Sequence, residues 1–266
     1  MPKIIAVAGK GGTGKTTLCG MIVKHLADRK NGSILAIDAD PNSNLNEVLG
    51  IKLPVTLGDI REEVLKNTSG ETAPGGMTKQ EYMDFMFGDA LSEENDFDLL
   101  VMGRTQGKGC YCFINGIIRS QIDKYASSYS HIIVDNEAGF EHISRGILPH
   151  VDTLLLVSDC SRRGIQAAGR AAALANELNL KPETMKLIVN RSPATGLAPA
   201  TASTSGIDLA PGILEEIKTQ NLDLLGIIPQ DENVYEYDAE GKPIVDVPDD
   251  SPIKEAVRRI ITELNL

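Results

Sequence analysis

The feature that most constrains this chain is a glycine-rich stretch, residues 9–17, that stands between two patterned segments. It reads Gly-Lys-Gly-Gly-Thr-Gly-Lys-Thr-Thr and fits the pattern G-x-x-x-x-G-K-[ST]. Residues 3–8 before it are a short apolar run, typical of a buried strand, and residues 16–28 after it have helical spacing. The sequence therefore predicts a strand that turns tightly into a helix near the start of the chain.

The residue types of this stretch suit phosphate binding. Glycines let backbone N–H groups curl around phosphate oxygens without obstruction by Cβ atoms, and the following helix presents its N-terminus to the anion. Lys15 can reach the β and γ phosphates of a nucleotide, and Thr16 can offer its hydroxyl group to Mg²⁺. The predicted nucleotide-binding residues of the loop are Gly11, Gly12, Thr13, Gly14, Lys15, Thr16 and Thr17.

Apolar strands alternate with helical segments along the whole chain of 266 residues, with no internal repeat and no domain boundary. This order predicts an α/β fold, with a mainly parallel, doubly wound sheet and helices on both faces, in a single domain spanning residues 1–266. Further strands are predicted at residues 33–38, 98–103, 131–135, 152–158, 186–191 and 224–229. Helices are predicted at residues 46–66, 78–87, 115–126, 162–178 and 253–264. In the second of these helices Tyr82, Phe85 and Met86 are expected to face the core.

Carboxylates follow two of the predicted strands, at the sheet edge where open α/β folds bind ligands. Asp38 and Asp40 end the strand at 33–38, and their spacing places them on one side while the strand persists. Asp-Pro at positions 40 and 41 is also a common turn dipeptide, so a plain strand-end turn stays open. Asp135 ends an apolar strand in the Walker B manner, which predicts that it contacts the water shell of Mg²⁺.

Two of the four cysteines form a Cys-x-Cys pair, Cys110 and Cys112, on a loop that begins with glycine. Two thiolates this close can bind one soft or borderline ion such as Zn²⁺, Ni²⁺ or Cu⁺, but a tetrahedral thiolate site needs four. A twofold dimer in which each subunit gives both cysteines would complete the site, whereas two buried cysteines near a strand end is the alternative. Cys19 and Cys160 are predicted to be isolated buried or half-buried thiols.

The charge balance weighs against two classes of partner. Asp and Glu number 37 against 26 Lys and Arg, which gives a net charge of −11 and opposes sequence-independent binding to DNA or to anionic membranes. No signal peptide and no membrane-spanning apolar run is recognised, so a cytoplasmic location is expected. The final helix is amphipathic but mixed in charge, which favours core packing over membrane anchoring.

Lys10 is a second lysine inside the glycine-rich loop, and with it the loop resembles the deviant Walker A motif of the family that contains MinD, ParA and the nitrogenase iron protein. The resemblance implies an ATPase that binds ATP or ADP with Mg²⁺, in which Lys10 reaches the nucleotide of a partner subunit. It also implies that Asp40, in the first switch, orients the attacking water or touches the Mg²⁺ shell. In the second switch, which begins at Asp135, the Gly139 amide would sense the γ-phosphate. Lys10, Lys15, Asp40 and Asp135 are thus the expected catalytic residues.

The same resemblance implies an adenine site near the end of the chain. Asn190 and Arg191 match the position where the family contacts adenine through an asparagine amide, and Pro229 begins a stretch that resembles the loop packed on the base. A strand-end cap is the other interpretation of Asn190.

Within this family, the stretch from Gly107 to Cys112, taken with Asp-Asn-Glu-Ala-Gly at 135–139, is most similar to the CooC/AcsF proteins. A nitrogenase-type reductase is disfavoured because residues 135–140 contain no cysteine. The resemblance implies an ATP-dependent homodimer that assists nickel insertion into carbon monoxide dehydrogenase or acetyl-CoA synthase. Cys110 and Cys112 would then hold Ni²⁺ or Zn²⁺. A nucleotide-switched scaffold, or a positioning ATPase like MinD or ParA without a metal role, is the alternative.

Overall fold

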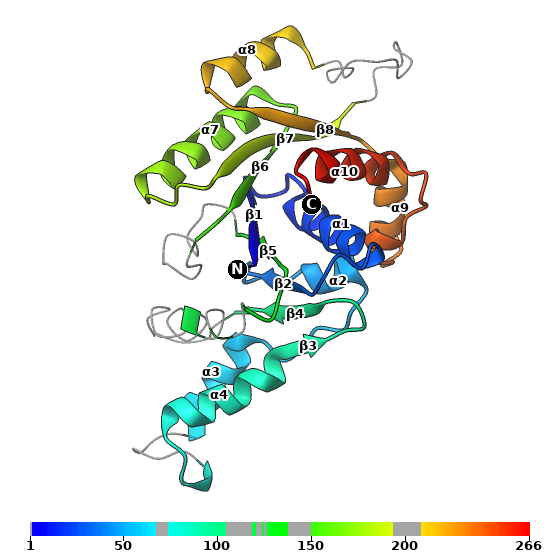
Figure 1. The fold of residues 1–266 in the computed structure, drawn as a ribbon. Helices are drawn as coiled ribbons and strands as arrows, with labels where there is room; N and C mark the ends of the chain where they lie inside the picture. Colours follow the sequence, from blue (N-terminus) through cyan, green and yellow to red (C-terminus); the bar gives the residue numbers. More distant parts are fainter. Residues whose placement is uncertain are drawn as a thin grey trace.

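A computed structural model describes residues 2–67, 74–104, 119–120, 124, 127–137, 150–193 and 209–266. Within these ranges eight strands form one sheet in the order β3-β4-β2-β5-β1-β6-β7-β8 (Figure 1). The strands are β1 Lys3–Gly9, β2 Ile34–Asp38, β3 Leu91–Glu93, β4 Asp98–Val101, β5 His131–Asp135, β6 Thr153–Asp159, β7 Thr184–Ser192 and β8 Leu224–Pro229. All neighbours are parallel except β3, which runs antiparallel to β4 at one edge of the sheet.

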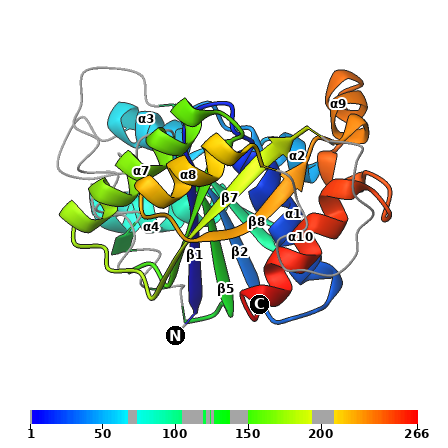
Figure 2. The ribbon, with the colours of Figure 1, turned by 90° about the horizontal axis from the view of Figure 1, so that it is seen from above.

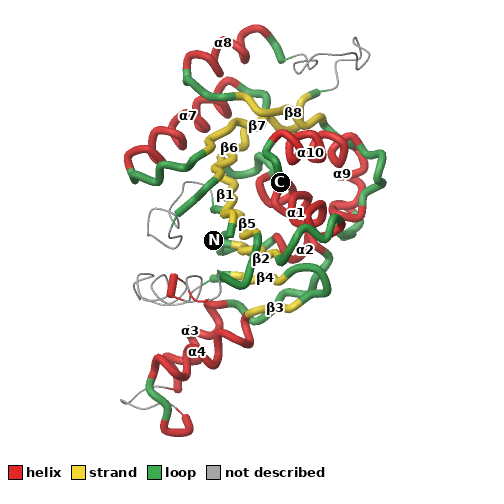
Figure 3. The backbone as a smooth tube through the Cα atoms, viewed as in Figure 1, coloured by secondary structure: helices red, strands yellow, loops and turns green. Residues whose placement is uncertain are grey.

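Helices cover both faces of this sheet, as Figures 2 and 3 show. On one face lie α1 Lys15–Asp28, α2 Leu45–Leu49, the short 3-10 helix η2 Ile244–Asp246 and α10 Pro252–Glu263. On the other face lie α3 Leu57–Asn67, α4 Lys79–Ala90, α7 Arg162–Glu177 and α8 Pro211–Thr219. The 3-10 turn η1 Pro74–Gly76 precedes α4, and α9 Glu232–Ala239 follows β8. The predicted fold class, a mainly parallel sheet with helices on both faces, is confirmed.

The central strand β1 supplies side chains to both layers of core. Ile4, Ala6 and Ala8 pack in one cluster, whereas Ile5 and Val7 pack in the other. This alternation follows from the period of two along a strand, and a strand buried on both faces reads as an uninterrupted apolar run. The apolar run before the glycine-rich loop is therefore what fixes that loop at the end of the middle strand.

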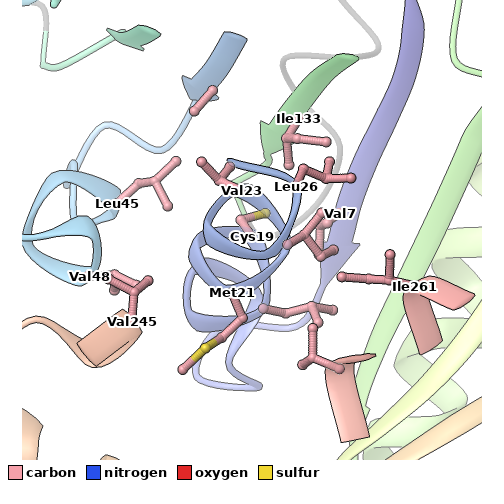
Figure 4. Packing of buried hydrophobic residues seen from close by; sticks show 14 of the residues in the cluster. Val7, Cys19, Met21, Val23, Leu26, Leu45, Val48, Ile133, Val245 and Ile261 are labelled. Atoms are coloured by element: carbon pink, nitrogen blue, oxygen red, sulfur yellow. The ribbon is translucent and has the colours of Figure 1, made fainter. Parts of the chain in front are cut away.

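Helix α1 is held behind the loop by apolar side chains that pack against the sheet. Cys19, Val23 and Leu26 lie against β1 and β5 (Figure 4). A Cβ atom at Gly20 would stand 2.4 Å from Val48 Cγ1, so α1 and α2 approach closely there and a side chain at position 20 would have to displace Val48. The helix that follows the loop is thus packed from both sides.

The amphipathic helix at the end of the sequence packs in the core, as its mixed charge predicted. Its apolar face, which includes Ile253, Val257 and Ile260, is buried in the α1 layer. The amphipathic pattern of this helix is therefore explained by packing against the sheet. Of the helices that the structure describes, none has the length and apolar character that crossing a bilayer requires.

The single helix predicted for residues 46–66 is wrong, because α2 and α3 are separate. Gly50 ends α2 with φ +74°, a left-handed conformation that glycine adopts without strain. The inward face predicted for the second half is confirmed, since Leu57, Ile60 and Val64 are buried.

The prediction for the helix at 78–87 is right for two of its three inward side chains. Tyr82 and Met86 are buried, but Phe85 is 61% exposed, because it lies on the face of α4 turned away from the core. The helix runs on to Ala90 and begins with a capping box formed by Thr78 and Glu81. Strand β3 and helices α8 and α9 were not predicted.

Candidate nucleotide site

The glycine-rich loop joins β1 to α1 through backbone conformations that only glycine adopts freely. Gly12 and Gly14 have φ values of +78° and +89°. Gly14 is the N-cap of α1 and no side chain in the described part of the chain caps this helix, so its first-turn N–H groups stay available for a ligand. A helix N-terminus without a protein cap is a binding site for a phosphate group.

The two lysines of the loop differ in environment. Lys15 is 7% exposed, and its Nζ donates a hydrogen bond of 3.4 Å to the Lys10 carbonyl oxygen, which also accepts from Thr13 Oγ1 at 2.9 Å. The Lys15 ammonium is therefore held across the loop, at the carbonyl group of Lys10. Lys10 has an exposed side chain that can extend away from its own loop.

Asp38 and Asp135 meet at the carboxyl ends of neighbouring strands. They are partners in the register of β2 and β5, and both side chains are buried. Burial, together with the charge of Asp40, raises the pKa of Asp38 to about 6, and burial, together with the charges of Asp38 and Asp40, raises that of Asp135 to about 7. Hydrogen bonds from the backbone N–H groups of Leu45 and Asp40 lower the pKa of Asp38, and one from Thr16 lowers that of Asp135.

The environment of Asp135 fits a divalent cation. Among the described residues its Oδ1 atom, which is buried, has no hydrogen-bond partner, while the Thr16 side chain bonds to the same carboxyl group. An unpartnered carboxylate oxygen beside a threonine hydroxyl at a phosphate loop is the oxygen donor set that Mg²⁺ prefers. Asp135 and Thr16 thus lie where the sequence predicted magnesium ligands.

Asp40 lies in a short loop that turns around buried Asp38. The Oδ1 atom of Asp40 accepts hydrogen bonds from the backbone N and the Nδ2 of Asn42, at 2.8 and 3.0 Å. Asn42 Oδ1 in turn accepts a hydrogen bond from Nη2 of Arg104, which follows β4. Asn42 and Arg104 were missed by sequence reasoning, and because they are 62 residues apart, no local pattern pointed to them.

A cleft of about 1100 Å³ opens over the loop and brings most of these residues together. From the loop and the acidic strand ends it is lined by Gly11, Gly12, Gly14, Lys15, Thr16, Thr17, Asp40 and Arg191. Its far wall comes from α2 and from the turn at Gly241, with Glu47, Lys52, Asp238 and Lys242 among the residues there. This volume suits a nucleotide, and the mixture of cations and carboxylates gives the cleft both phosphate-binding and metal-binding chemistry.

Two of the residues predicted at the adenine site, Asn190 and Arg191, bond to the loop itself. Asn190 Nδ2 donates to the Thr13 carbonyl oxygen at 2.8 Å, and Arg191 Nη1 donates to that of Gly12 at 3.1 Å. Pro229 ends β8 next to them in the sheet, since it pairs with Ser192. Neither Asn190 nor Pro229 lines the cleft, and their contact with the base stays a prediction.

Three predicted site residues, Cys110, Cys112 and Gly139, lie outside the described residues. Within the described ranges, no three His, Cys, Asp or Glu side chains are grouped to hold a metal ion. The predictions for the two remaining cysteines are confirmed: Cys19 is buried and Cys160 is half-buried, both as free thiols. Burial, with the charges of Asp135 and Asp38, raises the pKa of Cys19 well above its ordinary value, so this thiol stays protonated beside the acidic pair.

Residues 4–244 match the CobQ/CobB/MinD/ParA nucleotide binding domain. The chain belongs to this family. As a member of this family it is an ATPase of the MinD/ParA type.

Among individual relatives, an uncharacterized ATP-binding protein of Methanocaldococcus jannaschii is 38% identical over 98% of both chains. The carbon monoxide dehydrogenase accessory protein CooC of Rhodospirillum rubrum is 29% identical over 91% of this chain and 89% of its own length. Among solved structures, the septum site-determining protein MinD of Pyrococcus horikoshii, complexed with Mg-ADP, superposes with a TM-score of 0.68. That alignment covers 100% of this chain and 96% of MinD at 21% identity, so it supports the fold.

Proposed function

We propose that this protein is an ATP-dependent metallochaperone that assists nickel insertion into carbon monoxide dehydrogenase or acetyl-CoA synthase. The observation that carries the proposal is the 29% identity to CooC over 91% of the chain, in a sequence that also contains Cys110-Tyr111-Cys112. The cleft supports the ATP-driven part, because the phosphate loop and the Asp40 carboxylate both line it.

In the nucleotide half, Lys15 and the N–H groups of the α1 N-terminus bind the β and γ phosphates of ATP. Thr16 and Asp135 hold Mg²⁺ through hydroxyl and carboxylate oxygens, and the bound ion would neutralise phosphate charge. Asp40, which Asn42 orients, positions the water that attacks the γ-phosphate. MgADP in the related MinD structure supports this choice of ligands.

In the metal half, Cys110 and Cys112 of two subunits give four thiolates to one Ni²⁺ or Zn²⁺ cargo ion. Lys10 closes the dimer by reaching the partner's nucleotide, which its exposed side chain permits. Nucleotide exchange then shifts the dimer between two states with different metal affinity, and the metal passes to its client enzyme.

The second candidate is a nucleotide-switched scaffold or a positioning ATPase like MinD and ParA, with no metal role. Similarity to MinD favours it, but the buried apolar face of α10 and the net charge of −11 count against attachment to membrane or DNA. Sedimentation with anionic liposomes, with and without ATP, tests the membrane arm, where cosedimentation would favour this candidate.

Metal titration of the reduced protein separates the two. We expect one Ni²⁺ or Zn²⁺ per dimer, with an affinity that changes when ATP is added. The variant with both Cys110→Ala and Cys112→Ala should lose this stoichiometry, whereas the control Cys160→Ser should keep it. Unchanged metal binding and dimerisation in the double variant would refute the bridging site.

A further inference from the structure

The end of strand β7 holds the phosphate loop through Asn190 and Arg191, and this pair of contacts is called the β7 grip. Two hydrogen bonds run from consecutive side chains of β7 to consecutive carbonyl groups of the loop. Asn190 Nδ2 reaches Thr13 O at 2.8 Å, and Arg191 Nη1 reaches Gly12 O at 3.1 Å. These contacts join parts of the chain that are 177 and 179 residues apart, so they are tertiary contacts and not features of a local turn.

Both the nitrogen and the oxygen of the Asn190 side-chain amide form hydrogen bonds within the protein. Its Nδ2 binds the loop, and its Oδ1 accepts a hydrogen bond of 2.8 Å from the backbone N–H of Arg191. The side chain is 5% exposed, and a Cβ atom at Gly14 would stand 2.3 Å from Nδ2. Asn190 therefore fills the space against the loop and is fixed in orientation by Arg191.

Arg191 adopts a backbone conformation that is uncommon for a residue with a side chain. Its φ is +55°, which costs free energy unless the surroundings stabilise it. This conformation lies where the pairing of β7 with β8 shifts register, between Val189 and Ser192. Its N–H donates a hydrogen bond to Asn190 Oδ1, and its guanidinium donates one to Gly12 O. The strained residue therefore orients Asn190 and also contacts the loop directly.

Because peptide bonds are planar, these contacts with the loop carbonyls also orient the loop N–H groups that bind phosphate. In a trans peptide the carbonyl of one residue points opposite to the N–H of the next. Anchoring the carbonyls of Gly12 and Thr13 on β7 thus turns the N–H groups of Thr13 and Gly14 away from β7, toward the inside of the loop. Those N–H groups are the ones that a phosphate loop offers to its anion.

We infer that Asn190 and Arg191 are positioning residues of the phosphate loop, which preorganise its N–H groups for the phosphates of the nucleotide whatever base it carries. The inference rests on the ATP-binding part of the proposed function. It gives Asn190 a role through the loop that is separate from the predicted contact with adenine.

The experiment compares ATP with tripolyphosphate, which has the phosphates but no base. Binding of each, with Mg²⁺, is measured by calorimetry for the wild type, Asn190→Ala and Arg191→Gly. Glycine at position 191 removes the guanidinium and relieves the positive φ, so this variant should melt at the same temperature or higher. The exposed Arg170→Ala on α7 is the matched control and should bind both ligands like the wild type.

We expect both variants to weaken ATP and tripolyphosphate by the same factor, about 10-fold, since each frees a loop carbonyl from its partner. A fall in phosphate affinity at unchanged or higher melting temperature in Arg191→Gly separates positioning from a structural role. Weakened ATP with unchanged tripolyphosphate would assign Asn190 to the base and overturn the inference, as would unchanged binding of both. A wild type that binds ATP sustains the nucleotide half of the proposed function in either case, whereas one that binds neither ligand refutes both.

Discussion

Asp38 and Asp135 are register partners on the adjacent parallel strands β2 and β5, and both carboxyl groups are buried. Hydrogen bonds and one cation partly compensate for their burial: two backbone N–H groups reach Asp38, the Thr16 hydroxyl reaches Asp135, and the charge of Lys15 favours ionised Asp135. Two acids so placed oppose each other's ionisation, and a cation between them and the nucleotide would remove that opposition.

This arrangement makes the stability of the nucleotide-free protein depend on pH. Burial raises the pKa of Asp135 to about 7, far above that of an unfolded chain, so the folded state holds a proton that the unfolded state has lost. The contribution of protonated Asp135 to stability is therefore fully present below about pH 4 and is lost as the pH rises through about 7. Asp135→Asn should abolish ATP hydrolysis yet raise the unfolding free energy at pH 8 by on the order of 2 kcal/mol. Urea unfolding at pH 5 and pH 8 measures this, and an equal gain at both values would contradict it.

The contact between Arg104 and Asn42 links the end of β4 to Asp40. Arg104→Ala should free Asn42, loosen Asp40 and lower kcat for ATP about 3- to 10-fold while leaving KM unchanged. Steady-state hydrolysis by Arg104→Ala, Asn42→Ala and the double variant forms a cycle. Non-additive effects are expected because the two side chains act in series, and strictly additive losses would show that they act separately.

Two glycines of the loop should respond differently to alanine. A Cβ atom at Gly9 would stand 2.2 Å from the Val157 carbonyl oxygen, whereas nothing lies within 4 Å of one at Gly12. Both have positive φ, so Gly12→Ala costs about 1–2 kcal/mol of stability for conformation alone. Gly9→Ala must also displace the β1–β6 pairing and should cost about 3 kcal/mol or more. Thermal unfolding of the two variants ranks them, and the reverse order would contradict the packing of β1 against β6.

Alanine variants of Lys10 and Lys15 should distinguish nucleotide binding from ATP hydrolysis. Lys15→Ala removes the buried ammonium held across the phosphate loop and should abolish ATP binding. Lys10→Ala should bind ATP normally but lose nucleotide-dependent dimerisation and about 100-fold or more of hydrolysis, as for a cation supplied by a partner. Nucleotide calorimetry and light scattering measure the two effects, with the exposed Lys218→Ala of α8 as the control. Wild-type turnover by Lys10→Ala would rule out a role in trans.

The sequence predicts those parts of the molecule whose determinants are local. The strand before the loop, the helix after it and the buried position of Asp135 each follow from a short run of residues. Asp38 was predicted at a strand end, but its pairing with Asp135 depends on β5 lying between β1 and β2, which no local pattern specifies.

What sequence reasoning missed depends on residues brought together by folding. Gly50 breaks the expected long helix, and a Cβ atom there would stand 2.6 Å from Pro243 Cγ, almost 200 residues along the chain. Phe85 was expected inward because its neighbours Tyr82 and Met86 are, but helical periodicity alone does not decide which residues at the border of a face are covered. Asn42 and Arg104 meet beside Asp40 only through folding, because 62 residues separate them in the sequence.

The grip of β7 on the phosphate loop also sets an order of events during synthesis. Thr13 emerges from the ribosome 177 residues before Asn190, and β1 lies between β5 and β6, both more than 100 residues downstream. Such distant contacts close late, because the intervening chain must first be ordered. A growing chain thus carries its nucleotide motif long before it can bind nucleotide, and ATP affinity will arise only once β7 has left the exit tunnel.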